Sequence, residues 1–397
     1  MSCRQPTDAA RRLVAERGLW AARLFYLAYY AATAALLPFL PLYYQSRGLQ
    51  GSRIGLLAAV PPVLAVVGGT LWGALADSSH RHRLVLMLAV GGSGVSALLV
   101  ARAGTFAWLV PAVIGLAAFL APIPSLADHA VLQLLGERGD RYGRVRLWGA
   151  VGWGVSAPLA GLLVERTNLT SAFGLFTFLM LVLLLATAAL PMATRPAGGR
   201  RNSLGALLRR PGWTYFLLVA FVGGSSLGFA HHYLFLYMDA VGVDPTSMGM
   251  ALSAATLSEL AFFYWTDRLI RRWGVLRLLL LGAALGGVRL LLYAVTEAPW
   301  LILAIQLLHG PAFAMMWAAG VTAAHRLAPP GAGATAQGAF AGVNFGLAGG
   351  AGALIGGVLL DHMHPQEMYA WAGGGVLVLV ALLRGAGRRQ AARLGLA

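Results

Sequence analysis

Apolar residues run in twelve long stretches along the chain, separated by short polar segments rich in glycine, proline and arginine. Each stretch can cross the hydrocarbon core of a bilayer as an α-helix, which takes about 20 residues. The pattern therefore predicts an all-α membrane protein with twelve transmembrane helices. The stretches cover residues 20–44, 53–76, 84–102, 106–135, 145–164, 170–191, 213–238, 248–266, 278–296, 299–325, 335–360 and 368–384.

Composition supports the bilayer as the solvent of this chain. Hydrophobic residues make up 58% of it and charged residues 11%, and the mean hydropathy is +0.71. So few charges cannot cover a water-exposed surface. Residues 1–19 are polar and basic, and the apolar stretch after them is too long for the core of a signal peptide, so we expect it to stay as the first span.

The arginines indicate how the chain is oriented. If the N-terminus is cytoplasmic, 25 of the 30 arginines lie in cytoplasmic segments and four lie outside, with Arg289 alone inside a span. Basic loops resist translocation, so this asymmetry predicts cytoplasmic termini in a cell (inner) membrane. The net charge of +16 is confined to short clusters beside the spans, which suits lipid headgroups better than nucleic acid.

Residue types that are absent exclude several activities. Every basic side chain apart from histidine is arginine, so the chain has no lysine for a phosphate-binding P-loop or a Schiff base. Its one cysteine, Cys3, allows no disulfide and no cysteine metal site. We therefore expect a protein that is not an enzyme, needs no cofactor or metal, and does not hydrolyse ATP itself.

The sequence repeats itself after about half its length. Asp77 and Asp267 occupy similar loops 190 residues apart, and Gly161 and Gly357 end similar spans 196 residues apart. Similar offsets predict two six-helix bundles. The expected organisation is an N-terminal arm, a first bundle, a cytoplasmic linker, a second bundle and a basic tail, over residues 1–19, 20–191, 192–211, 212–384 and 385–397.

Two cytoplasmic loops carry a family resemblance. Both loops combine an aspartate with arginines. The first loop contains Gly73, Asp77, Arg81 and Arg83, and the second contains Asp267, Arg268 and Arg271. Together with twelve spans in two halves, they resemble the major facilitator superfamily. We expect these residues to form a conformational gate at the cytoplasmic side. The alternative is that they only set topology.

A narrower resemblance rests on two segments. Residues 142–153 (Tyr-Gly-Arg-Val-Arg-Leu-Trp-Gly-Ala-Val-Gly-Trp) and 306–310 (Gln-Leu-Leu-His-Gly) are similar to the lactose permease and phenylpropionate permease branch of proton symporters. This resemblance implies a monomeric transporter that binds a small solute and protons.

Ionisable residues inside the spans are the candidate site. A charge at the bilayer centre costs about 2.5–3.5 kcal/mol, so it persists where it faces protein or water and is paired. Counted from the ends of their spans, Glu259, Arg289 and His309 all lie roughly 15–18 Å deep. In the first half, Asp128 and Arg146 flank a short loop and are expected to form a second pair.

The resemblance assigns roles to these residues. Asp128, Arg146, Trp153, Glu259 and His309 are implied to bind substrate. Glu259, Arg289, His309 and Asp128 are implied to couple the proton. The sequence departs from the lactose permease pattern at two positions: Ala312 replaces the coupling carboxylate, and Phe345 lies near the place of an intramembrane lysine.

Structural interpretations of the same residues stay open. Glu259 and Arg289 could form a neutral buried pair, His309 could be a core histidine, and Trp153 could be a packing residue. The function predicted is import of a small polar or aromatic solute with protons, by alternating access. The alternatives are an efflux antiporter and a membrane assembly factor on the same scaffold.

Overall fold

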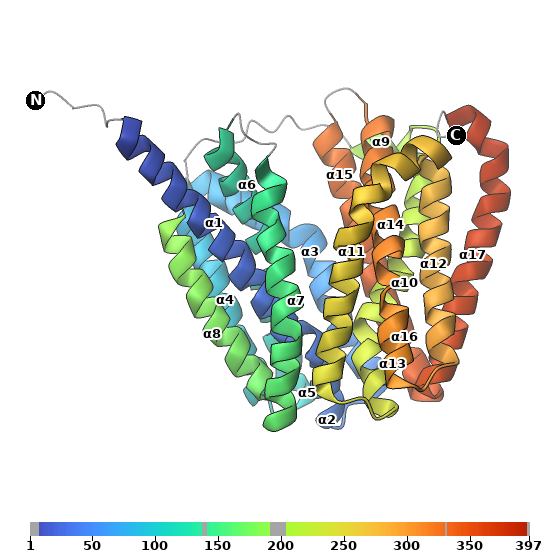
Figure 1. The fold of residues 1–397 in the computed structure, drawn as a ribbon, viewed down its shortest axis with the longest axis horizontal. Helices are drawn as coiled ribbons and strands as arrows, with labels where there is room; N and C mark the ends of the chain where they lie inside the picture. Colours follow the sequence, from blue (N-terminus) through green and yellow to red (C-terminus); the bar gives the residue numbers. More distant parts are fainter. Residues whose placement is uncertain (1–7, 137–140, 191–203, 330–331, 395–397) are drawn as a thin grey trace, which may run out of the picture.

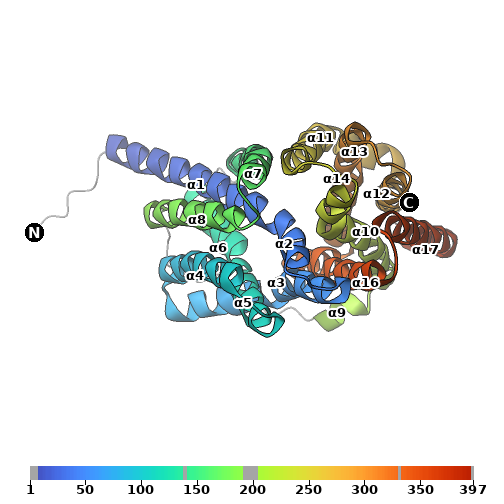
Figure 2. The same cartoon turned by 90° about the horizontal axis from the view of Figure 1, so that it is seen from below.

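A computed structural model describes residues 8–136, 141–190, 204–329 and 332–394. The described residues form helices arranged in two bundles (Figures 1 and 2). The helices of the first bundle are α1 (Asp8–Leu36), η1 (Leu37–Phe39), α2 (Leu40–Ser46), α3 (Gly51–Ser79), α4 (His82–Arg102), α5 (Phe106–Leu120), α6 (Ile123–Leu135), α7 (Tyr142–Arg166) and α8 (Ser171–Ala189).

The second bundle follows the short helix α9 (Leu204–Leu208), which lies in the expected linker. Its helices are α10 (Trp213–Ala240), α11 (Pro245–Trp273), α12 (Val275–Ala294), α13 (Pro299–Gln306), α14 (His309–Leu327), α15 (Gly333–Ala341), the π-helical turn η3 (Gly342–Leu347), α16 (Ala348–His362) and α17 (Pro365–Leu394). Helix α1 begins within the expected arm, and α17 continues into the expected tail.

Eleven helical segments in the described residues are long and apolar enough to cross a membrane. The twelfth predicted span corresponds to α11, which is as long as the others but falls outside that set because it carries Ser253, Ser258, Glu259 and Asp267. These polar residues, which lower its overall apolarity, supply part of the candidate site. The fold is that of a multi-pass membrane protein.

Apart from the span that contains the π-helical turn η3, three of the spans are interrupted, and proline accounts for each of these breaks. Proline lacks a backbone N–H and clashes with the preceding turn of a helix. Pro38 lies in η1 between α1 and α2, Pro122 lies between α5 and α6, and Pro311 lies in the first turn of α14 just after the break that follows α13. The break between α13 and α14 places His309 at the start of a half-helix.

Glycines bring the two bundles into backbone contact through two pairs of helices, α3 with α16 and α7 with α11. A Cβ atom at Gly161 of α7 would lie 2.1 Å from the carbonyl oxygen of Pro245, and one at Gly249 of α11 would lie 2.3 Å from that of Ala157. In the other pair, a Cβ atom at Gly357 would lie 2.5 Å from the carbonyl oxygen of Gly51. Missing side chains are what let these backbones approach so closely.

A carboxylate crosses between the bundles beside each glycine contact. Asp361 of α16 accepts a hydrogen bond from the backbone N–H of Ser52 at 2.9 Å. Glu165 of α7 accepts from the backbone N–H of Thr246 at 3.3 Å and from its hydroxyl. Ser52 and Thr246 are 194 residues apart and Glu165 and Asp361 are 196 apart, so the two contacts are equivalents in the repeat.

The bundles diverge at their other end, as the course of α7 and α11 shows in Figure 1. This is the end where α1 begins and α17 ends, and it carries the arginine-rich loops.

Candidate functional site

A cluster of polar and ionisable side chains in the second bundle surrounds Arg289 of α12. Arg289 is buried, with 4% of its surface exposed. Its guanidinium donates to the hydroxyl of Tyr293 at 3.1 Å, to Nδ1 of His309 at 3.1 Å and to the side-chain oxygen of Gln306. All three partners are neutral acceptors. Gln306 is fully buried.

Glu259 of α11 completes this group from the other side of His309. Its carboxylate lies 3.9 Å from Nε2 of His309, and the two side chains are 28% and 25% exposed. Because Nδ1 of His309 accepts from Arg289, a neutral imidazole carries its proton on Nε2, the nitrogen that faces Glu259. The carboxylate of Glu259, the Nε2–H of His309 and the guanidinium of Arg289 therefore lie in one row, in which the imidazole presents a donor toward the carboxylate.

Local sequence explains how Glu259 and His309 come together. Pro311 cannot donate to the carbonyl of Leu307, and the hydroxyl of Ser258 donates to that carbonyl instead. A Cβ atom at Gly310 would lie 2.3 Å from the backbone of Ser258, so glycine is required for α11 and α14 to touch here. The residues next to this contact, Glu259 and His309, are thereby fixed side by side.

In the first bundle the expected direct pair between Asp128 and Arg146 is wrong. Among the described residues, no carboxylate oxygen lies within 4.0 Å of either Arg146 or Arg289. The hydroxyl of Tyr26 donates to Asp128 at 2.6 Å, and Arg146 donates to the hydroxyl of Tyr30. The guanidinium of Arg146 also lies over the rings of Tyr30 and Tyr26, at 4.2 Å and 5.3 Å from their centroids.

Tyr26 therefore lies between Asp128 and Arg146, which the sequence predicted to pair directly. The residue it missed here, Tyr26, has a recognisable signal, because it lies four residues before Tyr30 and shares one face of α1 with it. Which helix that face meets depends on how α1 is rotated, and the chain gives no direct sign of that rotation.

The two halves of the site meet at Trp153. Its ring lies 6.4 Å from that of His231 of α10, which belongs to the second bundle. A Cβ atom at Gly154, the residue after Trp153, would lie 3.8 Å from the side chain of Thr256, which is three residues before Glu259 on α11. The structure thus brings Arg146, Trp153, Glu259 and His309 to the region between the bundles, and His231 joins them as a residue that sequence reasoning did not assign.

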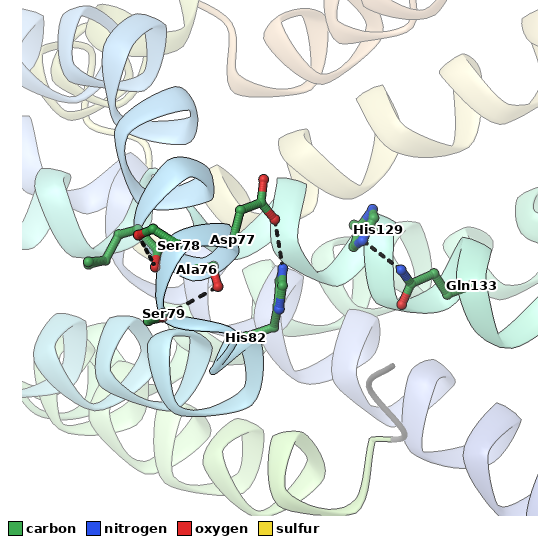
Figure 3. A network of polar contacts seen from close by, with 8 residues as sticks. Ala76, Asp77, Ser78, Ser79, His82, His129 and Gln133 are labelled. Atoms are coloured by element: carbon green, nitrogen blue, oxygen red, sulfur yellow. Dashed lines mark hydrogen bonds and ion pairs between the residues drawn. The ribbon is translucent and has the colours of Figure 1, made fainter. Parts of the chain in front are cut away.

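The expected gate residues do not contact each other across the bundles in the described structure. Asp77 pairs with His82 of its own bundle at 2.9 Å rather than with an arginine (Figure 3). His82 stacks on His129, which is hydrogen-bonded to Gln133 at 2.8 Å. Arg83 donates to the carbonyl of Leu190 at 3.0 Å.

The copy of this loop in the second bundle is similarly self-contained. Arg268 lies over the rings of Tyr264 and Trp265, while Asp267 and Arg271 are exposed. A Cβ atom at Gly73 would meet nothing within 4 Å. These contacts match the divergence of the bundles at this end.

Comparison with known proteins identifies the class. A model of the MFS_1 like family matches residues 19–371, so the chain belongs to that family. The maltose permease of Geobacillus stearothermophilus is 29% identical over 91% of this chain and 93% of its own length. The probable 3-phenylpropionic acid transporter of Escherichia coli (strain K12) is 27% identical over 75% of this chain and 79% of its own length.

Solved structures show the same fold. The crystal structure of the nucleoside transporter NupG superposes with a TM-score of 0.80 at 16% sequence identity, covering 92% of this chain and 98% of that one. The sequence resemblance to the major facilitator superfamily and to its permeases is therefore confirmed, and the relatives and structural neighbours are solute transporters.

Proposed function

We propose that the protein imports a small organic solute together with protons, by alternating access in the inner membrane with both termini in the cytoplasm. The observation that carries the proposal is the row of Glu259, His309 and Arg289. The carboxylate of Glu259, partly exposed midway along its bundle, can load and release a proton, and the guanidinium of Arg289 sets the tautomer in which the Nε2–H of His309 faces that carboxylate.

Glu259 is the residue we assign to the coupling proton. Ala312, at the position of the coupling carboxylate in lactose permease, is buried and carries no acid, whereas Glu259 lies beside His309 and three residues from Thr256, which packs against Gly154 of the first bundle. Charging of Glu259 changes the field felt by Arg146, so solute binding in the first bundle and proton binding in the second influence each other. Asp128, held by Tyr26, contributes to the same field.

The arrangement of the two bundles favours a conformation that is open to the cytoplasm. The glycine contacts and the carboxylates Glu165 and Asp361 join the bundles at the end predicted to face outside, and the arginine-rich loops lie where the bundles diverge. In the opposite state, the loops around Asp77 and Asp267 would come together as the cytoplasmic gate.

The test is proton movement during uptake by reconstituted vesicles. Addition of a transported solute should alkalinise the outside, and Glu259→Gln should abolish that signal while solute exchange persists. Glu297→Gln, which changes an exposed loop carboxylate, is the matched control and should behave as the parent does. Uptake by the parent without any pH change would replace symport with facilitated diffusion.

A further inference from the structure

Arg23 of α1 is the one arginine in the described part of the chain with a buried N–H group that lacks an acceptor. Its Nε atom is shielded from solvent and has no hydrogen-bond partner among the described residues. The residue as a whole is half-buried, so it is accessible from the surface. Leaving a donor of a charged group buried and unsatisfied is costly, and an acceptor on an anionic ligand would remove that cost.

Two tryptophans from different helices border this guanidinium. The guanidinium of Arg23 lies over the ring of Trp20, 4.7 Å from its centroid. The ring of Trp148 of α7 meets that of Trp20 edge-on, with centroids 6.3 Å apart. Cation–π attraction holds the guanidinium but supplies no oxygen acceptor for its N–H groups. Trp20 is 60% exposed, and exposed tryptophans of membrane proteins are typical of the headgroup level of the bilayer.

Trp148 lies on the side of α7 that is turned away from the region between the bundles. Arg144 and Trp148 are each two residues from Arg146, and Val155 is two residues from Trp153. Two residues correspond to roughly 200° around a helix, so these side chains lie opposite the site residues. Arg144 is exposed, and Val155 is 56% exposed. In a multi-pass membrane protein, the outward side of a bundle helix faces lipid.

Helices α1 and α7 run side by side in the same direction. A Cβ atom at Gly152 would lie 2.2 Å from the carbonyl oxygen of Leu27, and the hydroxyl of Ser156 donates to the carbonyl of Ala31 at 2.7 Å. Both pairs are 125 residues apart in sequence, so the offset stays constant along the contact. A residue of α1 therefore lies level with the residue of α7 that is 125 positions later.

By this register Arg23 lies level with Trp148, and Trp20 lies level with the residue that follows Arg144. The two arginines and two tryptophans thus gather within about one turn of each helix, toward the end that carries the arginine-rich loops. Leu24, next to Arg23, is 44% exposed and apolar. The cluster lies where the lipid-facing surface of the two helices reaches the headgroups.

We infer that these ends of α1 and α7 bind the headgroup of an anionic phospholipid. Its phosphate accepts hydrogen bonds from Arg23 and Arg144, and its acyl chains lie against Leu24 and Val155. Trp20 and Trp148 border the headgroup. The choline of a zwitterionic lipid would place a cation beside two guanidinium groups, so an anionic headgroup is favoured. The inference is independent of the transported solute and of proton coupling, and the proposed orientation places the lipid in the cytoplasmic leaflet.

The experiment is native mass spectrometry of the purified, delipidated full-length protein in detergent. It measures binding of phosphatidylglycerol and of phosphatidylcholine with the same acyl chains. The protein should bind one molecule of phosphatidylglycerol at least roughly fivefold more tightly than phosphatidylcholine, because one unit of charge near an arginine at the membrane surface is worth about that factor.

Three variants locate the site. Arg23→Gln should weaken the binding of phosphatidylglycerol at least about tenfold, since hydrogen bonds between charged groups are the strong ones. Arg144→Gln changes an exposed residue and should weaken it roughly fivefold. It keeps the test decisive if Arg23→Gln fails to fold. Arg277→Gln is the matched control, because Arg277 is exposed near the same end of the second bundle, and it should bind as the parent does.

Three outcomes would overturn the inference. Equal losses in all three variants would show diffuse attraction of lipid to the basic loops. Equal binding of the two lipids would show that the headgroup charge is not recognised. Glycerol 1-phosphate has the phosphate without the chains and should not displace the bound lipid at equal concentration. Its displacement of the lipid would assign the site to a soluble phosphate.

Discussion

The two ends of the molecule hold the bundles by different means. At the end away from the arginine-rich loops, glycines bring backbone against backbone, and Glu165 and Asp361 reach across to the first turns of α11 and α3. At the other end, the polar contacts of Asp77 and Arg83 stay within one bundle. Contacts between the bundles should control the conformation, whereas contacts within one bundle should not, so the two ends should respond differently to substitution.

The glycine contacts should give the largest effect. Gly161→Leu places a side chain where even a Cβ atom would lie 2.1 Å from the carbonyl of Pro245. Overpacking costs about 1–3 kcal/mol, which shifts the ratio of the two conformations by roughly 5- to 150-fold. Spin labels at Arg166→Cys and Val295→Cys, in a Cys3→Ser background, should report a longer distance, and uptake should fall.

Gly174→Leu on α8 is the control for this substitution, because a Cβ atom at Gly174 meets nothing within 4 Å. It should leave the label distance and uptake unchanged. If Gly161→Leu also left both unchanged, the glycine contact would have no part in the transport cycle.

The two carboxylates should give a smaller and symmetrical effect. Glu165→Gln or Asp361→Asn removes a negative charge from a helix N-terminus, where it is worth about 1 kcal/mol, or roughly fivefold in the same ratio. Since the two contacts lie in different helix pairs, their effects should add in the double variant. A large effect of one and none of the other would show that the repeat is structural at this position and not functional.

Asp244 and Glu165 both bind the N-terminus of α11, but Asp244 belongs to the same bundle as α11 and Glu165 to the other. Substitution of Asp244 therefore tests the stability of the helix without changing a contact between the bundles. Its side chain accepts a hydrogen bond from the backbone N–H of Ser247 at 2.8 Å. Hydrogen bonds from Ser247 hold the pKa of Asp244 below its ordinary value. The stabilisation by Asp244 is therefore fully present above the pKa that this carboxyl has in the unfolded chain. It is lost as the pH falls through the lower pKa of the folded protein.

Asp244→Ala should lower the free energy of unfolding at pH 7 by about 0.5–1 kcal/mol. It should not change the distance between the spin labels at positions 166 and 295. Asp244→Asn keeps an acceptor and should cost less. The difference between the parent and Asp244→Ala should shrink below pH 4, as measured by thermal melts in detergent. A difference that grows on acidification would mean that Asp244 acts through another contact.

The sequence predicted the architecture well because hydrophobic length and arginine position act locally. It also brought Glu259, Arg289 and His309 to one level by counting residues along helices. Tyr26 was missed because hydrogen-bond partners depend on how neighbouring helices are rotated. The repeat of Gly161 with Glu165 and Gly357 with Asp361 was visible as a sign of duplication, but the target of each carboxylate lies on a helix distant in sequence.

The smallest effect is expected at the diverging end, from His82→Gln. His82 is 7% exposed and holds Asp77 at 2.9 Å within the first bundle, as Figure 3 shows. Glutamine keeps a donor for Asp77 but loses the stacking on His129, so the first bundle should lose about 0.5 kcal/mol of stability, the lower end of the range for an aromatic pair. Because no contact between bundles changes, the label distance should stay as in the parent.

Thermal melts and the label distance together test this last expectation. Asp77→Asn serves as the companion variant, since it weakens the same contact and also removes a charge from the proposed gate. It should favour the conformation seen in this structure, because the opposite state loses a gate residue. If His82→Gln moved the label distance as far as Gly161→Leu does, then contacts inside one bundle would control the conformation, and the distinction between the two ends would fail.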